Sequence, residues 1–125
     1  MTWKLEIYRA LFLALGTFEI IANANFLCLE NGMEYARLQH GEIPKRATRK
    51  QLKVKVVFML IFGLIFFSMG INSYFLHYVN ETYFLIVLIL FAVYAFGEAL
   101  YYRYWKTFGF SAVSALLLLV FWIWR

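Results

Sequence analysis

Four long runs of apolar residues divide the chain into hydrophobic segments and short polar connections. The runs cover residues 10–29, 54–71, 83–102 and 108–124. A helix needs about 17–25 mostly apolar residues to cross a lipid bilayer, so each run has the length of one membrane span. The pattern predicts an all-α polytopic membrane protein, a four-transmembrane-helix bundle that forms a single integral membrane domain over residues 1–125.

The overall composition supports the same class. The chain is 64% hydrophobic and 22% aromatic, whereas soluble domains are roughly 45–50% apolar. Such a surface requires lipid as its solvent, which indicates a multi-pass protein of the cell membrane.

The positive charges are unevenly distributed between the connections. Of the twelve Lys and Arg, nine lie in or beside the connections 30–53 and 103–107, and three (Lys4, Arg9 and Arg125) lie toward the other ends of the spans. Loops rich in Lys and Arg stay in the cytoplasm, so this bias predicts two cytoplasmic loops with both termini outside.

The first run carries polar groups within the predicted span. At about 100° per residue, Glu19 and Asn23 share one helical face with other residues along the segment, while Asn25 points elsewhere. That face is made of Phe12, Gly16, Glu19, Asn23, Phe26, Glu30, Glu34 and Arg37. Ten Leu, Ile or Phe residues contribute roughly −3 to −6 kcal/mol to insertion, and a central carboxyl with two amides cancels most of it. We therefore expect this helix to face protein.

Two interpretations of Glu19 stay open. A protonated carboxyl can donate a hydrogen bond to a neighbouring helix and act only in packing. Alternatively, Glu19 and Asn23 bind a proton or cation along an internal path, the usual hypothesis for an acid inside a membrane.

A second acid, Glu98, follows in the third run. Near the interface it can extend to water or pair with Arg103 or Lys106. The alternative is that Glu98 and Asn23 converge on one polar cavity.

The basic connection is the most distinctive polar segment. Because it adjoins a span, anionic lipid headgroups are the nearer partner, at about 1 kcal/mol per charge; an acidic cytosolic protein is the alternative, and nucleic acid is not expected. The candidate contacts are Lys45, Arg46, Arg49, Lys50, Lys53 and Lys55.

Helix boundaries are marked at both sides of this connection. Thr48 and Gln51 have the spacing of a capping box and predict a helix start. The first helix either continues through residues 30–39 toward Gly41 and Pro44 or breaks at Asn31-Gly32. Ala22-Asn23-Ala24 resembles a signal-peptide cleavage site, but the apolar run continues past it, so we expect the segment to be retained.

No catalytic, metal-binding or cofactor-binding motif is found. His40 and His77 are predicted on opposite sides of the membrane, which excludes a His-based metal site within one chain. Cys28 is the single cysteine and cannot form an internal disulfide. The sequence carries no nucleotide-binding loop, nucleophile elbow or zinc-protease motif.

These observations favour a non-enzymatic membrane protein. The leading hypothesis is an accessory, regulatory or protective (immunity-like) subunit that acts through helix packing and its basic loop. The alternative is a small homo-oligomeric ion- or proton-coupled transporter or channel that uses Glu19, Asn23 and Glu98.

Overall fold

The computed structural model describes residues 3–124, which form five α-helices and no strand. The helices are α1 (Trp3–Cys28), α2 (Gly32–Gln39), α3 (Arg49–Leu76), α4 (Glu81–Tyr102) and α5 (Trp105–Trp124). Of the described helices, α1, α3, α4 and α5 are each long and apolar enough to cross a membrane. The prediction of an all-α chain with four candidate spans is therefore confirmed.

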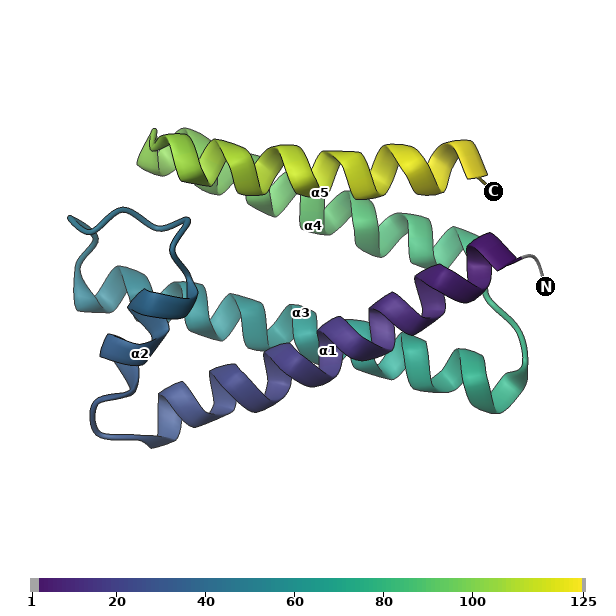
Figure 1. Cartoon of the computed structure of the whole chain (residues 1–125), viewed down its shortest axis with the longest axis horizontal. Coiled ribbons are helices and arrows are strands. Elements are labelled where there is room, and N and C mark those ends of the chain that lie inside the picture. Colours follow the sequence, from purple (N-terminus) through teal and green to yellow (C-terminus); the bar gives the residue numbers. More distant parts are fainter. Residues whose placement is uncertain (1–2, 125) are drawn as a thin grey trace.

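The four long helices form two antiparallel pairs (Figure 1). The closest packing is between α1 and α3 and between α4 and α5, and the two pairs meet less extensively along α3 and α4. We call the end that carries α2 and the 40–48 loop the loop end. Helix α1 begins, and α5 ends, at the opposite end of the molecule (Figure 1).

Glycine allows α1 and α3 to approach closely. A methyl group added at Gly16 would lie 2.3 Å from the backbone nitrogen of Phe67, and one at Gly63 would lie 2.9 Å from Cβ of Glu19. Membrane helices associate through such small residues because their backbones can then come into direct contact. The crossing also places Glu19 against α3.

Aromatic rings fill the interior between the two pairs. Phe12 of α1 stacks on Phe84 of α4 with ring centroids 4.2 Å apart, and it also contacts Phe66 of α3. Phe121 of α5 packs edge-on against Tyr8 of α1. These rings belong to one buried cluster that draws on all four long helices, so the half of the molecule away from the loop end has an apolar interior.

The structure settles the ends of the first two elements. The first helix does not continue through residue 39, because the chain turns after Cys28 and restarts as α2 at Gly32. A Cβ at Gly32 would lie 1.8 Å from the carbonyl oxygen of Phe26, so only glycine fits this reversal. The capping box is confirmed: Gln51 N–H donates to Thr48 Oγ1, and Thr48 N–H donates to Gln51 Oε1.

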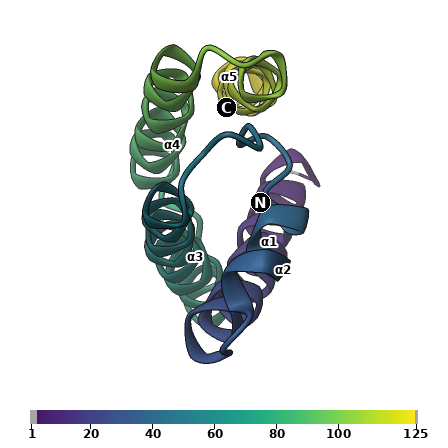
Figure 2. The ribbon, with the colours of Figure 1, turned by 90° about the vertical axis from the view of Figure 1, so that its left-hand side faces the viewer.

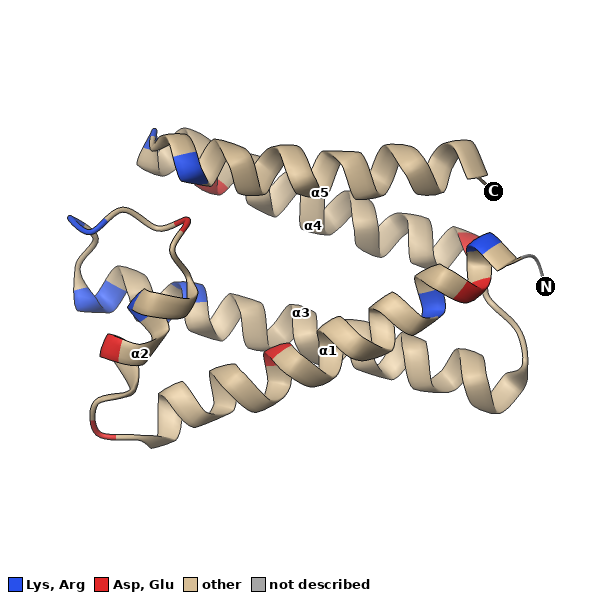
Figure 3. Cartoon of the chain, in the orientation of Figure 1, with Lys and Arg blue, Asp and Glu red and all other residues tan. Residues whose placement is uncertain are grey.

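Charged residues gather at the loop end (Figure 3). Lys and Arg occupy the 40–48 loop, the first turns of α3 and the α4–α5 turn, whereas Lys4 and Arg9 lie near the start of α1. Arg125, which entered the sequence-based charge count, lies outside the described residues.

The close helix crossing yields a stability prediction. Gly16→Ala should lower the free energy of unfolding by about 1–3 kcal/mol, because its methyl group meets the α3 backbone and the two helices must separate. SDS titration of the detergent-solubilised protein, followed by helical circular dichroism, measures this loss. Gly109→Ala is the control, since a Cβ there meets nothing within 4 Å. Equal stability of the two variants would contradict the crossing.

Candidate functional site

The polar residues of α1 form the first part of a buried network. Asn23 is fully buried, and its Nδ2 donates to the carboxylate of Glu19 at 2.6 Å and to the Glu19 carbonyl oxygen at 2.8 Å. Residues four apart lie one above the other on a helix, so the sequence spacing itself creates this pair. Glu19 and Asn23, which were predicted to share one helical face, are thus joined directly.

The 40–48 loop supplies the second part of the network. His40 is buried, and its Nε2 lies 2.8 Å from Oδ1 of Asn23. Because Asn23 uses its NH₂ group on Glu19, its Oδ1 must accept, and His40 Nε2–H donates. The other ring nitrogen, Nδ1, lies 3.6 Å from the carboxylate of Glu42. His40 therefore bridges α1 and Glu42.

Lys55 is the centre of the third part. Its Nζ lies 3.0 Å from Oε1 of Glu42 and 2.8 Å from Oε1 of Glu98, and its side chain is only 1% exposed. The ammonium group also lies over the rings of Tyr94 and Phe110. The hydroxyl of Tyr94 donates to the second oxygen of Glu98 at 2.7 Å. A buried charge is tolerated when it is paired and hydrogen-bonded in this way.

The same loop contacts the second helix pair. The Thr107 hydroxyl of α5 donates to the carbonyl oxygen of Glu42, and the Arg46 guanidinium donates to the carbonyl oxygen of Tyr102 at the end of α4. With Asn23 on α1 and Lys55 on α3, the loop is bonded to all four long helices. Figure 2 shows the loop crossing the space between the helix ends.

Local sequence explains why this loop is ordered. Ile43 and Ala47 are buried and pack with Tyr102, so apolar side chains hold the segment down between the helices. Arg37 of α2 donates to the carbonyl oxygens of Lys45 and Ala47, each at 2.9 Å. Ala47 is buried, and buried backbone carbonyls need such partners in place of water.

The surroundings of Glu42 lower its pKa. Burial alone would raise the pKa of this carboxyl, but the neighbouring His40 ring and the Lys55 ammonium favour the charged form more strongly and bring the pKa to about 2. Glu42 is therefore an anion at neutral pH. Its charge balances Lys55 from the loop side, while Glu98 does so from α4.

The predicted candidate residues fall into two groups. Glu19, Asn23 and Glu98 belong to one network, but Glu98 reaches it through Lys55 and pairs with neither Arg103 nor Lys106. Lys55 differs from its predicted role as a lipid contact, because it is buried between two carboxylates. The remaining basic candidates are all exposed, namely Lys45, Arg46, Arg49, Lys50 and Lys53. Asn25 is also exposed.

Three members of the network were missed by sequence reasoning. From sequence, His40 and Glu42 were predicted only as parts of the cytoplasmic connection 30–53, and Tyr94 was not singled out. The sequence does contain one indication that this loop is packed, in Ile43 and Pro44. Apolar residues inside a charged connection indicate that the connection packs on the helices.

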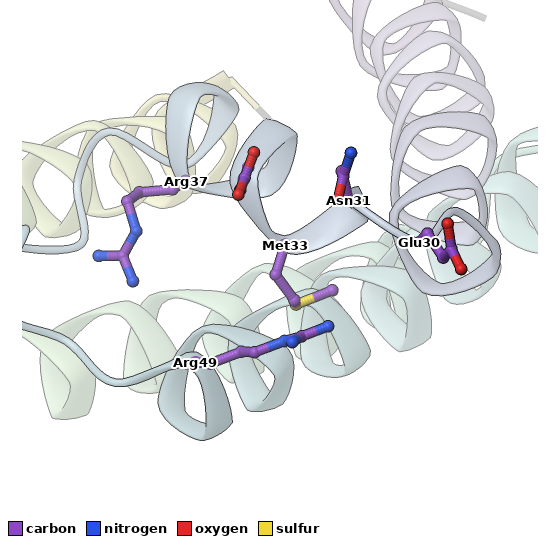
Figure 4. A pocket seen from close by; sticks show the side chains of 6 residues that line it. Glu30, Asn31, Met33, Arg37 and Arg49 are labelled. Carbon is purple, nitrogen blue, oxygen red and sulfur yellow. The ribbon is translucent and has the colours of Figure 1, made fainter.

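A separate hollow of about 180 Å³ is lined by the turn after α1, by α2 and by the first residue of α3. Figure 4 shows Met33 reaching from α2 toward α3, with Arg49 beside it and Glu30 at the end of α1. Acidic and basic side chains both line this hollow. Its mixed charge selects no particular ligand, so the buried network remains the candidate site.

The chemistry available to the network is limited. Within residues 3–124, no three His, Cys, Asp or Glu side chains converge to hold a metal ion. Over the same residues, every buried side-chain nitrogen or oxygen has a hydrogen-bond partner. The network can exchange protons between neighbouring groups, but the described part of the chain aims no unpaired polar atom at a missing ligand.

Comparison of the chain with protein-family models, curated proteins and solved structures finds no significant match.

The lowered pKa of Glu42 yields a pH prediction. A carboxyl with a folded pKa of about 2, against 4.5 for an unperturbed group, stabilises the fold by about 3 kcal/mol above pH 4.5. That contribution disappears as the pH falls from 4.5 toward 2. The stability difference between the unaltered protein and Glu42→Gln, measured by SDS titration, should shrink over this range. A difference independent of pH would contradict the assigned ion pairs.

Proposed function

We propose that this chain is a multi-pass cell-membrane protein that acts without enzymatic chemistry, as an accessory, regulatory or protective subunit of a larger membrane complex. The observation that carries the proposal is the bonding of the 40–48 loop to four helices. A loop held in this way presents its exposed basic residues from a fixed surface, as a docking element requires.

The charge distribution supports an orientation. With the loop end in the cytoplasm, the exposed basic residues lie beside anionic lipid headgroups, and α1 begins and α5 ends on the outer side. We define the basic platform as Lys45, Arg46, Arg49, Lys50 and Lys53, all of which are exposed. Its partners are anionic lipids and an acidic surface of a larger membrane protein.

The continuity of the network favours one second candidate, a proton-coupled transporter. Glu19, Asn23, His40, Glu42, Lys55, Glu98 and Tyr94 are linked end to end. From Glu19 toward the other end of the molecule, however, the interior is filled by the aromatic cluster around Phe12. A chain of this structure would have to oligomerise or rearrange to build a complete path, so transport is the weaker proposal.

Charge reversal on the platform tests the leading proposal. After cross-linking in the source membrane, the tagged protein should co-purify with one larger membrane protein in fixed ratio, measured by native mass spectrometry. Lys45→Glu with Arg49→Glu should reduce that recovery at least tenfold, because the acidic partner surface is then repelled. Arg103→Glu with Lys106→Glu reverses two exposed charges outside the platform and should leave recovery unchanged.

A different result would contradict the accessory role. Recovery of homo-oligomers alone would contradict it. If purified protein in liposomes also carries a proton flux, and Glu19→Gln abolishes that flux while the fold is retained, the transporter proposal is correct.

A further inference from the structure

A groove between α3 and α4 opens at the loop end. It has a volume of about 440 Å³, and its walls include Gln51, Val54 and Phe58 of α3 and Gly97 and Tyr101 of α4. The Gln51 side chain donates to the Tyr101 hydroxyl across its shallow end at 2.9 Å. At its deep end the rings of Phe58 and Tyr94 lie 5.2 Å apart. The cavity is therefore bounded at both ends.

On the side of α3 next to the groove, basic side chains come first along the helix and apolar side chains follow. A second hollow, of about 480 Å³, shares Val54 and Phe58 with the groove and is also lined by Lys50, Lys53 and Val57. These residues fall on one helical face, since they are spaced by three or four positions. Along the helix, two exposed lysines are followed directly by apolar side chains.

The polar groups on the floor of the groove already have ion-pair or hydrogen-bond partners within the protein. Lys55 and Glu98 lie beneath it as an ion pair, and Tyr94 donates to Glu98. These groups need no hydrogen bonds from an occupant. An apolar chain lying above them would keep water away from the ion pair.

The absence of a side chain at Gly97 creates much of the open space. A Cβ built there meets no atom within 4 Å, although Gly97 lines the groove. The same holds for Gly109 on α5, which is not among the residues that line this groove. The two glycines therefore form a matched pair for substitution.

We propose that this groove and the adjoining hollow together bind one anionic phospholipid, with its phosphate against Lys50 and Lys53 of the hollow and an acyl chain lying over Val54, Phe58 and Gly97. The inference rests on the proposed membrane location and deepens it. The transition from lysine to apolar side chains on α3 coincides with the boundary between headgroups and acyl chains that a spanning helix requires. Over the seven residues from Gln51 to Phe58 the groove descends about 10 Å, the depth of the upper part of an acyl chain.

Native mass spectrometry of the full chain in detergent with added lipid tests the proposal. Palmitoyl-oleoyl phosphatidylglycerol should be retained at one copy in clear preference to the phosphatidylcholine with the same chains. Lys50→Gln with Lys53→Gln should weaken retention about 25-fold, at about fivefold per charge. Arg103→Gln with Lys106→Gln removes two charges elsewhere and should leave it unchanged.

Filling the groove tests the acyl-chain contact. Gly97→Leu should reduce retention of phosphatidylglycerol at least tenfold, whereas Gly109→Leu should not, with thermal unfolding of both variants compared with the unaltered protein. Equal retention of the two lipids by the unaltered protein would overturn the proposal without the need for any variant. The proposal would also be overturned if the lysine variant lost phosphatidylglycerol and Gly97→Leu retained it, because the lipid would then bind only to surface charge. Neither outcome bears on capture of the larger partner, which tests the proposed function separately.

Discussion

The ion pairs of Lys55 hold the loop end together. Away from the loop end the aromatic cluster around Phe12 joins the two helix pairs, and at the loop end the 40–48 loop is bonded to both pairs. Lys55 on α3 binds Glu42 of the loop and Glu98 of α4 at once. Removing one member of such a buried group leaves an uncompensated charge, at a cost of about 3–5 kcal/mol. The position of the 40–48 loop, and with it that of Lys45 and Arg46 of the basic platform, depends on this cation.

The interior changes character along its length. Toward the loop end it is polar and built from residues of four elements, whereas toward the other end it consists of stacked rings around Phe12 and Phe84. The crossing of α1 and α3 at Gly16 and Gly63 lies between these regions and brings Glu19 against α3. The linked titratable groups therefore lie on one side of an apolar interior, which is why we propose docking in preference to transport.

Local features were predictable from sequence, and distant pairings were not. The capping box of Thr48 and Gln51 and the pairing of Glu19 with Asn23 follow from spacings of three and four residues. The pairing of Lys55 with Glu98 spans 43 residues and depends on how α3 meets α4. Helical periodicity left open whether the first helix continues through residue 39 or breaks at Asn31-Gly32, because it does not reveal the close contact of Gly32 with Phe26 that fixes the break. From sequence, Arg103 and Lys106 were the ion partners considered for Glu98, and Lys55 was assigned to lipid contact, so their pairing was not predicted.

Hydrogen exchange at the loop tests this account most directly. The amides of Ile43 and Ala47 donate to backbone carbonyls within the loop, and they should exchange slowly while Lys55 holds Glu42. Lys55→Met should raise exchange across residues 40–47 at least tenfold and leave the middle of α3 protected, whereas Lys53→Met, at an exposed position, should change neither. Unchanged loop protection in Lys55→Met would contradict the central role of this cation.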